Sequence, residues 1–340
     1  MPNESQPELL NDAEEHYEQH IRPKSLKEFI GQDRLKRNLA VFVKAAKMQN
    51  RPLPHMLFYG PPGLGKTTLS RILAHEMSVN IRVTSGPILE KPGDIAAILS
   101  ALEAGDILFI DEIHRLRNNI EEILYPALEE FELDLVVGQG PGATTVRLPL
   151  NRFTLIGATT KAGNLTSPLK ARFGYEERLS FYEVPAITRI LERTAGILGI
   201  CFATDSAKEL ARRCRGTPRV ANRLLARVRD FAVVQNCRTI SMDIIDQALT
   251  AMKIDHAGLT HMDLDILHAV IDRYDGGPVG LDTIAVSVGE DKRTIEEVFE
   301  PFLIKMGFIS RTPRGRMATR LAYKHLGKEQ DAPFQGSLYE

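Results

Sequence analysis

Short apolar segments alternate with segments of helical periodicity in the first half of the chain. The apolar segments, each of which predicts a buried strand, are residues 55–59, 81–85, 106–110 and 153–158. Apolar residues recur every three or four positions in the remaining segments, which predicts helices at 25–49, 66–77, 93–104 and 120–131. Strands that alternate with helices indicate a parallel, doubly wound α/β sheet with helices on both faces.

One segment interrupts this alternation. Residues 133–137 and 146–150 each alternate apolar side chains with polar ones or glycine, around a turn at 139–142 that is rich in Gly and Pro. Two such runs around a turn predict a β-hairpin over 133–150. The pattern fits either an edge extension of the main sheet or a projecting hairpin whose apolar tip is a docking surface.

After Pro185 the strand pattern gives way to helical periodicity. Helices at 186–198, 206–215, 219–234 and 242–252 predict a small helical bundle, with Ser206 and Glu209 as a capping box. Helices at 260–274, 281–288 and 293–306 then precede a strand–turn–strand at 308–319, which is the order of a winged helix. The predicted parts are a mobile leader (1–20), an α/β domain (21–182), a helical domain (183–254), a winged-helix domain (255–330) and a flexible tail (331–340).

The composition is that of an ordinary globular protein. The 340 residues include 43 Lys and Arg against 44 Asp and Glu, a net charge of -1, and 43% are hydrophobic. These values exclude a disordered, collagen-like or membrane chain. No apolar run reaches the ~18 residues of a membrane span, and no signal peptide is apparent, so we expect a cytoplasmic protein. Cys201, Cys214 and Cys237 do not suggest a disulfide framework, and we expect buried free thiols.

The charges are sorted along the chain. Residues 1–20 contain six carboxylates and neither Lys nor Arg, whereas residues 305–324 contain six basic residues and no acidic one. Arg311, Arg314 and Arg316 fall at the predicted wing, where they form either a solvated surface or a contact to the DNA phosphate backbone. Few side chains there are suited to reading base edges, so the expected binding is not sequence-specific.

A phosphate-binding motif follows the first predicted strand. Residues 60–67 read GPPGLGKT, which fits GxxxxGK[ST] between a strand and a helix. Gly63 and Gly65 allow backbone N–H groups to surround phosphate oxygens, Lys66 reaches the β- and γ-phosphates, and the Thr67 hydroxyl ligates Mg²⁺. The segment therefore predicts a nucleotide site.

Two carboxylates follow the apolar strand at 106–110. Ligands of parallel sheets bind at the carboxyl ends of the strands, which is where Asp111 and Glu112 fall. Asp111 is expected in the metal shell, and Glu112 is expected to polarise the attacking water as a general base. This pair, placed after a phosphate-binding loop, favours hydrolysis over simple nucleotide binding.

Three more polar residues each have two interpretations. Thr159 either caps a turn at the end of the strand 153–158 or contacts the γ-phosphate. Arg172 is either a surface charge or an arginine finger, which stabilises charge on the transferred phosphoryl group from a neighbouring subunit. Arg219 is either a charge at the start of a helix or a phosphate sensor that links the helical domain to the nucleotide. Spacing alone does not decide among them.

Seven segments together resemble one family. They are GPPGLGKTTL (60–69), ILFIDEIHRL (107–116), LIGATT (155–160), LTSPLKARFG (165–174), RGTPRVANRLL (215–225), GGPVGLDTIA (276–285) and EPFLIKMGFISRTPRGRMAT (300–319). They look like the RuvB family, the bacterial AAA+ motors of Holliday-junction branch migration. The resemblance covers about residues 20–325 and implies an AAA+ ATPase core, a helical lid and a winged-helix DNA-binding domain.

The resemblance also implies roles for single residues. Lys66, Thr67 and Thr68 are assigned to ATP and Mg²⁺, Asp111 and Glu112 to metal and water, Thr159 to sensor 1, Arg172 to the finger and Arg219 to sensor 2. Further residues expected at the nucleotide pocket are Ile21, Arg22, Tyr182 and the segment Glu129, Glu130 and Phe131. Those expected to contact DNA are Arg311 and Arg316, with Arg293 as a further candidate. Thr at sensor 1 departs from the Asn usual in the wider AAA+ class, but is shared by RuvB-like sequences.

Two functions of different class are compatible with these features. The resemblance implies a homohexameric ring on duplex DNA at Holliday junctions, recruited by RuvA through the hairpin 133–150 and working alongside RuvC. The alternative is a non-motor AAA+ switch, such as an origin-recognition or loader protein, which also joins this core to a winged helix. The hairpin and the GTPRVANRLL stretch favour the motor.

Overall fold

The computed structural model describes residues 20–137 and 144–329, which form two compact units. The first unit runs to Leu198 and includes Thr217–Arg219, and the second takes Gly199–Gly216 and the chain from Val220 onward. Of the predicted leader only His20 lies among the described residues, and the predicted tail at 331–340 lies outside them.

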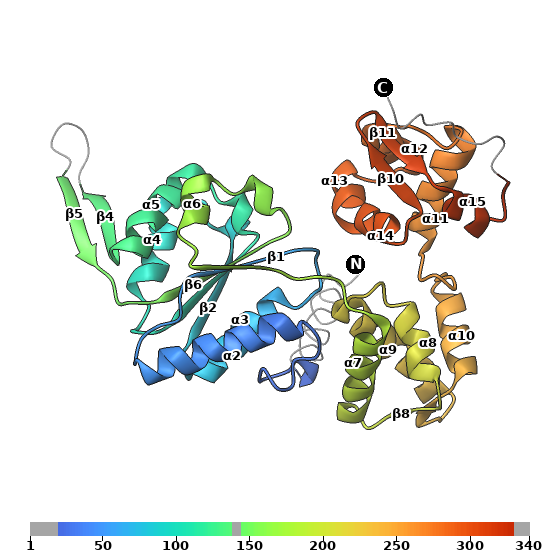
Figure 1. The fold of residues 1–340 in the computed structure, drawn as a ribbon, viewed down its shortest axis with the longest axis horizontal. Helices are drawn as coiled ribbons and strands as arrows, with labels where there is room; N and C mark the ends of the chain where they lie inside the picture. The colour runs from blue at the N-terminus through green and yellow to red at the C-terminus, as the bar shows by residue number, and fades with distance from the viewer. Residues whose placement is uncertain (1–19, 138–143, 330–340) are drawn as a thin grey trace, which may run out of the picture. The chain divides into compact units, whose positions relative to one another are not determined.

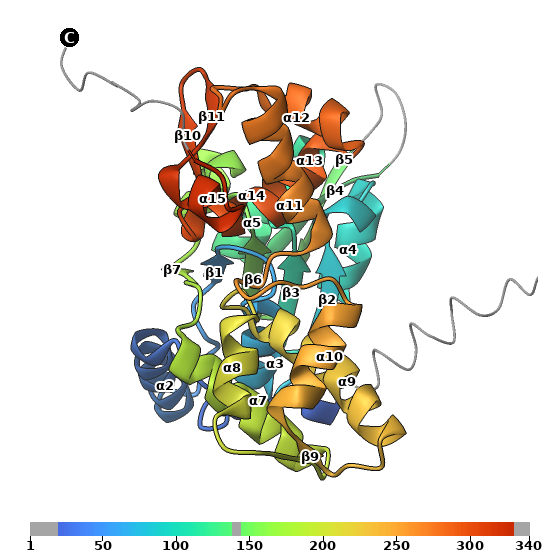
Figure 2. The ribbon, with the colours of Figure 1, turned by 90° about the vertical axis from the view of Figure 1, so that its right-hand side faces the viewer.

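Five parallel strands form the sheet of the first unit, in the order β2-β3-β6-β1-β7 (Figures 1 and 2). They are β1 Met56–Tyr59, β2 Ile81–Ser85, β3 Ile107–Asp111, β6 Thr154–Thr159 and β7 Tyr175–Arg178. The α-helices of this unit are α2 Asp33–Met48, α3 Lys66–Met77, α4 Pro92–Ser100, α5 Asn118–Glu129, α6 Ser167–Ala171 and α7 Val184–Ile197. The parallel sheet predicted from the sequence is confirmed.

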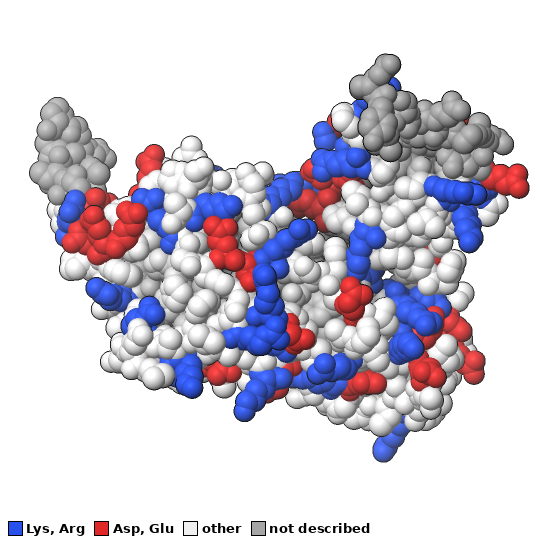
Figure 3. Space-filling model, viewed as in Figure 1, with Lys and Arg blue, Asp and Glu red and all other residues white. Residues whose placement is uncertain are grey.

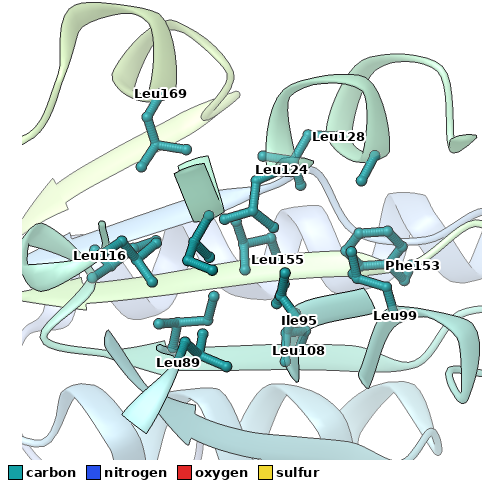
Figure 4. Close-up of a cluster of buried hydrophobic side chains, with 14 of the residues drawn as sticks. Leu89, Ile95, Leu99, Leu108, Leu116, Leu124, Leu128, Phe153, Leu155 and Leu169 are labelled. Atoms are coloured by element: carbon teal, nitrogen blue, oxygen red, sulfur yellow. The ribbon is translucent and has the colours of Figure 1, made fainter. Parts of the chain in front are cut away.

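Both faces of the sheet are buried, which explains why its strands read as continuous apolar runs. On one face Leu108 and Leu155 pack in a cluster with Ile95 of α4 and Leu124 of α5 (Figure 4). On the other face α3 packs against β3 and β6. Because the strands are parallel, the carboxyl ends of β1, β3 and β6 and the loops that follow them lie on the same side of the sheet, at one end of the strands.

Two predictions for this unit need correction. The helix expected over 25–49 begins only at Asp33, because Gly31 and Gln32 adopt positive φ angles of 80° and 51° that interrupt it. Strand β7 was not expected, because its sequence is YEER rather than apolar. It lies at the edge of the sheet beside β1, where only Glu177 of its two glutamates is buried, against Arg34 of α2.

The predicted hairpin is present as an antiparallel pair, β4 (Glu132–Val137) and β5 (Thr144–Pro149) (Figure 1). It forms a two-stranded sheet of its own, so the interpretation as an extension of the main sheet is wrong. The side chains of Val146 and Leu148 are exposed, and the predicted turn at 139–142 lies outside the described residues.

The second unit contains the remaining helices and three strand pairings. Its α-helices are α8 Ser206–Arg212, α9 Pro218–Val234 (whose first two residues belong to the first unit), α10 Met242–Ala251, α11 His261–His268, α12 Leu281–Val288, α13 Lys292–Thr294, α14 Glu300–Lys305 and α15 Arg320–His325. Strands β8 (Cys201–Phe202) and β9 (Thr239–Ile240) form a short parallel pair that the helical pattern did not predict.

The winged helix predicted near the C-terminus is also present. The antiparallel strands β10 (Ile309–Thr312) and β11 (Gly315–Ala318) follow α14, and Val279 forms an isolated bridge with Arg316. Apolar side chains of α11, α12 and α14 share one core with both strands. Helices α11 and α13 each continue into π-helical turns, at Ala269–Arg273 and Ile295–Phe299.

Two local predictions in the second unit are wrong. The helix-capping residue before α8 is Asp205, and Ser206 Oγ is buried without a hydrogen-bond partner, so Ser206 and Glu209 form no capping box. Of the cysteines only Cys214 is buried, whereas Cys201 and Cys237 are exposed; all three are free thiols. No helix in the described part of the chain is long and apolar enough to cross a membrane.

Candidate active site

The phosphate-binding loop connects the end of β1 to the start of α3. Gly65 precedes α3 with a φ of 99°, in the left-handed region that favours glycine. A Cβ at Gly65 would lie 3.1 Å from the Phe29 ring, so a side chain there would require the ring to shift. The N-terminal N–H groups of α3 therefore face the loop, where they form an anion-binding site.

Lys66 lies across this loop. Its Nζ donates hydrogen bonds to the carbonyl oxygens of Gly60 and Pro61, at 2.8 and 2.9 Å. Burial lowers the pKa of Lys66 to about 8, against the opposing effect of the nearby Asp111 and Glu112 carboxylates. A bound phosphate would replace two neutral carbonyl partners with a charged one and so relieve the cost of burying this ammonium.

Asp111 and Glu112 follow the buried part of β3. Glu112 adopts a φ of 50°, and a Cβ at Gly86 would lie only 2.5 Å from the Glu112 carbonyl oxygen. Gly86, which follows β2, thus allows the two strand ends to approach closely. The Glu112 carboxylate lies 3.4 Å from Arg115 on the protein surface, so the ion pair is weak.

Hard oxygen donors are available for Mg²⁺. The Thr67 hydroxyl is in the first turn of α3, and the Asp111 carboxylate ends β3, which packs against α3. Hydroxyl and carboxylate oxygens suit this cation, which usually keeps several waters and is bound through one or two carboxylates plus substrate phosphates. The donor set therefore fits a metal that arrives with a nucleotide.

Thr159 ends β6 beside Tyr59 of β1 and is buried. Its Oγ1 accepts a hydrogen bond of 2.9 Å from the backbone N–H of Lys161 and lies 2.8 Å from Nδ1 of His114. The turn-capping interpretation thus describes a contact that is present. A role toward the γ-phosphate remains a prediction.

Arg219 and Tyr182 both lie against the phosphate-binding loop. The Arg219 backbone N–H is 3.4 Å from the Gly63 carbonyl oxygen, and a Cβ at Gly63 would lie 3.0 Å from Arg219 Cβ. The Tyr182 hydroxyl donates a hydrogen bond of 3.2 Å to the Leu64 carbonyl oxygen, and burial raises the pKa of Tyr182. The start of α9 and the segment before α7 are therefore in contact with the loop.

The segment containing Ile21 and Arg22 is tied to α7. Ile21 is buried, and its carbonyl oxygen accepts a hydrogen bond of 2.8 Å from Arg193, which also pairs with Glu28 at 3.0 Å. Arg22 is half-buried. This segment precedes Phe29, whose ring lies against Gly65.

Arg172 and the segment Glu129–Phe131 are not brought to the phosphate-binding loop. Arg172 is the C-cap residue of α6 and pairs with Glu129 at 3.2 Å, and the exposed Glu130 is the C-cap residue of α5. Phe131 packs against His55 and Phe153, which precede β1 and β6. These contacts lie at the amino ends of the strands, whereas Lys66 and Asp111 lie at the carboxyl ends.

The candidate DNA-binding arginines all have acidic neighbours. Arg311 is exposed and lies 3.7 Å from Glu296, Arg293 pairs with Glu297 at 2.8 Å, and Arg316 pairs with the buried Glu300 at 2.8 Å. On the face shown in Figure 3, Lys and Arg are likewise interspersed with Asp and Glu. The basic stretch 305–324 is therefore partly neutralised by acidic residues that precede it.

Several residues at these sites were not expected from the sequence. Gly86 and Phe29 allow close approaches at Glu112 and Gly65, and His114 contacts Thr159. The ring of Tyr125 lies under the Arg172 guanidinium, 4.5 Å from its centre. His114 lies within a motif quoted above, but the other contacts join distant parts of the chain and have no local signal.

Three family models match the chain. The Holliday junction DNA helicase RuvB P-loop domain matches residues 21–179, the RuvB AAA lid domain matches 182–255 and the RuvB C-terminal winged helix domain matches 256–327. Among solved structures, the Thermotoga maritima RuvB Holliday junction branch migration motor is 47% identical, with a TM-score of 0.84 over 92% of this chain and 100% of that one. Two single-substitution variants of that protein give 47% identity and TM-scores of 0.85 over 92% of this chain and 99% of theirs.

Proposed function

Because the chain belongs to the RuvB family, we propose that it works as a homohexameric ring in which each subunit hydrolyses ATP with help from its neighbour. Membership of the family makes the chain an ATP-binding Holliday junction DNA helicase, the motor of branch migration. It also argues against the alternative of an origin-recognition or loader switch, because the matching lid and winged-helix models are those of RuvB. The proposed domains are 21–182, 183–254 and 255–330.

The contact between the phosphate-binding loop and Arg219 carries the proposal. A Cβ at Gly63 would lie 3.0 Å from Arg219 Cβ, so the loop lies against the start of α9, and a phosphate bound in the loop would be close to Arg219. Arg219 would respond to the charge of the nucleotide as sensor 2, and Tyr182 would respond through Leu64. ATP binding and product release would thereby move the helical lid.

Within one subunit the residues with proposed catalytic roles lie at the carboxyl ends of the strands. Lys66 binds the β- and γ-phosphates, with Gly63, Gly65 and the Thr68 N–H lining the same loop. Glu112 polarises the water, and Thr159 orients it or the γ-phosphate from the neighbouring strand. Thr67 and Asp111 would hold Mg²⁺, which supplies charge neutralisation on the phosphates when bound. Ile21 and Arg22 would border the pocket through the segment that ends at Phe29.

Arg172 is proposed to act on the ATP of the neighbouring subunit. Arg172 lies beside Glu129 at the amino ends of the strands, away from Lys66. This position supports a role outside the nucleotide pocket of its own subunit. Glu129, Glu130 and Phe131 would contribute to the same neighbouring site. A guanidinium there would stabilise charge on the γ-phosphoryl group during transfer.

The partners of the proposed ring follow from its surface. The exposed Val146 and Leu148 of the separate hairpin suit an apolar docking surface, and we assign it to RuvA. Arg311 and Arg316, with Arg293 as a further candidate, would contact phosphates of duplex DNA without reading its sequence. The ring would work alongside RuvC in the cytoplasm of a bacterium.

The mass of the assembly tests this proposal. With a non-hydrolysable ATP analogue and duplex DNA, we expect a mass of six subunits, and Arg172→Ala should retain ATP binding but lose hydrolysis. In mixed rings, an Arg172→Ala subunit should silence the ATP site of the wild-type neighbour that depends on its finger. A monomer under every condition, or normal hydrolysis by Arg172→Ala, would contradict the ring with a shared site.

A further inference from the structure

The side chain of Arg172 is held by several contacts at the end of α6. Its Nη1 donates a hydrogen bond of 2.7 Å to the Pro168 carbonyl oxygen, and its Nη2 lies 3.2 Å from Glu129 Oε2. The guanidinium lies over the Tyr125 ring, 4.5 Å from its centre, and the Arg172 side chain is only 19% exposed. The interpretation of Arg172 as a solvated surface charge is therefore wrong.

Two of the residues that hold this arginine, Tyr125 and Glu129, lie on one face of α5. Glu121, Tyr125 and Glu129 are spaced four residues apart, which places them in one row along the helix. Tyr125 lies under the guanidinium and Glu129 pairs with it, whereas the carboxylate of Glu121, the buried member of the row, is hydrogen-bonded to Tyr125 and Thr166.

Glu121 instead fixes the other end of α6. Its Oε2 accepts a hydrogen bond of 2.5 Å from the Thr166 hydroxyl and one of 3.1 Å from the Tyr125 hydroxyl. Thr166 is the N-cap residue of α6, where its Oγ1 also accepts the Leu169 N–H. Since α6 has only five residues, fixing its N-terminus to α5 determines where Arg172 emerges at its C-terminus.

We propose that Tyr125 and Glu121 are positioning residues for the arginine finger. Glu121 orients both the Tyr125 ring and the N-cap of α6, and Tyr125 orients the guanidinium through a cation–π contact. Arg172 Nε is buried and has no hydrogen-bond partner among the described residues. We therefore expect the Tyr125 ring, rather than a further hydrogen bond, to limit rotation at that end of the guanidinium. The inference rests on the proposed action of Arg172 on a neighbouring subunit.

A displaced finger should lower turnover and leave nucleotide affinity unchanged. We expect Tyr125→Leu to reduce kcat for ATP by about 10- to 100-fold, because misplacement of a catalytic group by ~1 Å is worth up to that much. The KM for ATP should change little. Tyr125→Phe keeps the ring and should lose less, and Glu122→Gln, an exposed neighbour on α5, should behave as the wild-type chain.

Mixed rings distinguish positioning of the finger from damage to the subunit itself. Each variant is mixed with Glu112→Gln, which lacks the proposed base of its own site but supplies an intact Arg172. Arg172→Ala is expected to lose hydrolysis alone, and Tyr125→Leu to be impaired alone. Both should regain hydrolysis in the mixture, because their own ATP sites are intact. If Tyr125→Leu fails to fold, Tyr125→Phe and Glu121→Gln provide the same comparison.

Each result decides a different point. The inference would be overturned if Tyr125→Leu hydrolyses ATP at the wild-type rate. If Tyr125→Leu does not fold, wild-type rates for both Tyr125→Phe and Glu121→Gln would overturn it. The inference would also be overturned if the mixture with Glu112→Gln restores hydrolysis to Arg172→Ala but not to Tyr125→Leu. Tyr125 would then serve only the ATP site of its own subunit. If Arg172→Ala is not restored either, the shared site itself fails and the inference fails with it.

Discussion

Arg316 and Glu300 form a two-fold hydrogen-bonded ion pair inside the winged-helix domain. Nε and Nη2 of Arg316 donate to the two carboxylate oxygens of Glu300, at 2.8 and 3.0 Å. The side chains are 12% and 4% exposed, so the pair is largely removed from water. It joins β11 to the first residue of α14, so Glu300 sets the orientation of the guanidinium that is proposed to contact a DNA phosphate.

Replacing Arg316 should affect stability as well as DNA binding. Arg316→Ala leaves the buried Glu300 carboxylate without its partner, which we expect to lower the free energy of unfolding of the domain by about 3 kcal/mol or more. Glu300→Gln in the same background should recover part of this loss. Thermal and denaturant unfolding of the wild-type chain and the two variants measure the effect, and an unchanged stability of Arg316→Ala would show that the pair contributes nothing.

Replacing Arg311 should affect DNA binding alone. Arg311 is 59% exposed and lies 3.7 Å from Glu296, so Arg311→Ala should change stability by no more than about 0.5 kcal/mol. If Arg311 contacts a phosphate, the variant should bind duplexes of every sequence more weakly, and its affinity should depend less on salt. Titrations over a range of salt concentrations test this, and a loss confined to one DNA sequence would contradict backbone recognition.

The burial of Lys66 should give the nucleotide-free chain a specific pH dependence. The pKa of Lys66 is lowered from 10.5 to about 8, so between these values the unfolded chain binds more protons than the folded one. The free energy of unfolding should therefore rise with pH across this window, by about 3 kcal/mol for this group. Lys66→Met should remove that part of the rise, while all other groups titrate as before.

Denaturant unfolding of both chains at pH 8 and pH 10 measures the difference. The slope with pH is compared, because the loss of the two Lys66 hydrogen bonds shifts the stability of the variant equally at both values. Parallel slopes for the wild-type chain and Lys66→Met would show that Lys66 is not buried as described.

Gly86 should prove necessary for turnover although it lies outside the phosphate-binding loop. A Cβ there would lie 2.5 Å from the Glu112 carbonyl oxygen and 3.2 Å from the Leu116 N–H, both of which are backbone atoms. Gly86→Ala should displace Glu112 and reduce kcat about 100-fold, with little effect on ATP binding by the loop at Lys66.

Gly93→Ala is the matched control for this variant. A Cβ at Gly93 meets no atom within 4 Å, and the residue lies in α4, where alanine is the better helix former. Steady-state ATPase kinetics of both variants give the comparison. Equal turnover by Gly86→Ala and Gly93→Ala would show that the position of Glu112 is not critical.

The sequence predicted the elements whose environment is uniform along their length. Strands β1, β3 and β6 are buried on both faces, so their apolar runs were sufficient evidence. Strand β7 lies at the edge of the sheet and carries the charged sequence YEER, and β8 and β9 have two residues each, which is too short for any periodicity.

The candidate site was predictable where residue types and spacing are dictated by phosphate chemistry, as at Lys66 and Asp111. The contacts that position them depend on segments far apart in the chain, such as Gly86 with Glu112 and Tyr125 with Arg172. The charge of the wing illustrates the same limit. The basic stretch begins at Lys305, just after the acidic residues that pair with Arg311 and Arg316.

Movement of a synthetic four-way junction tests most directly whether ATP hydrolysis at the Lys66 site drives branch migration. The wild-type chain, supplied with ATP, Mg²⁺ and RuvA, should convert a labelled junction with homologous arms into its branch-migrated duplex products. Lys66→Met and Arg172→Ala should leave the junction intact. Hydrolysis of ATP by the wild-type chain without any movement of the junction would contradict the account.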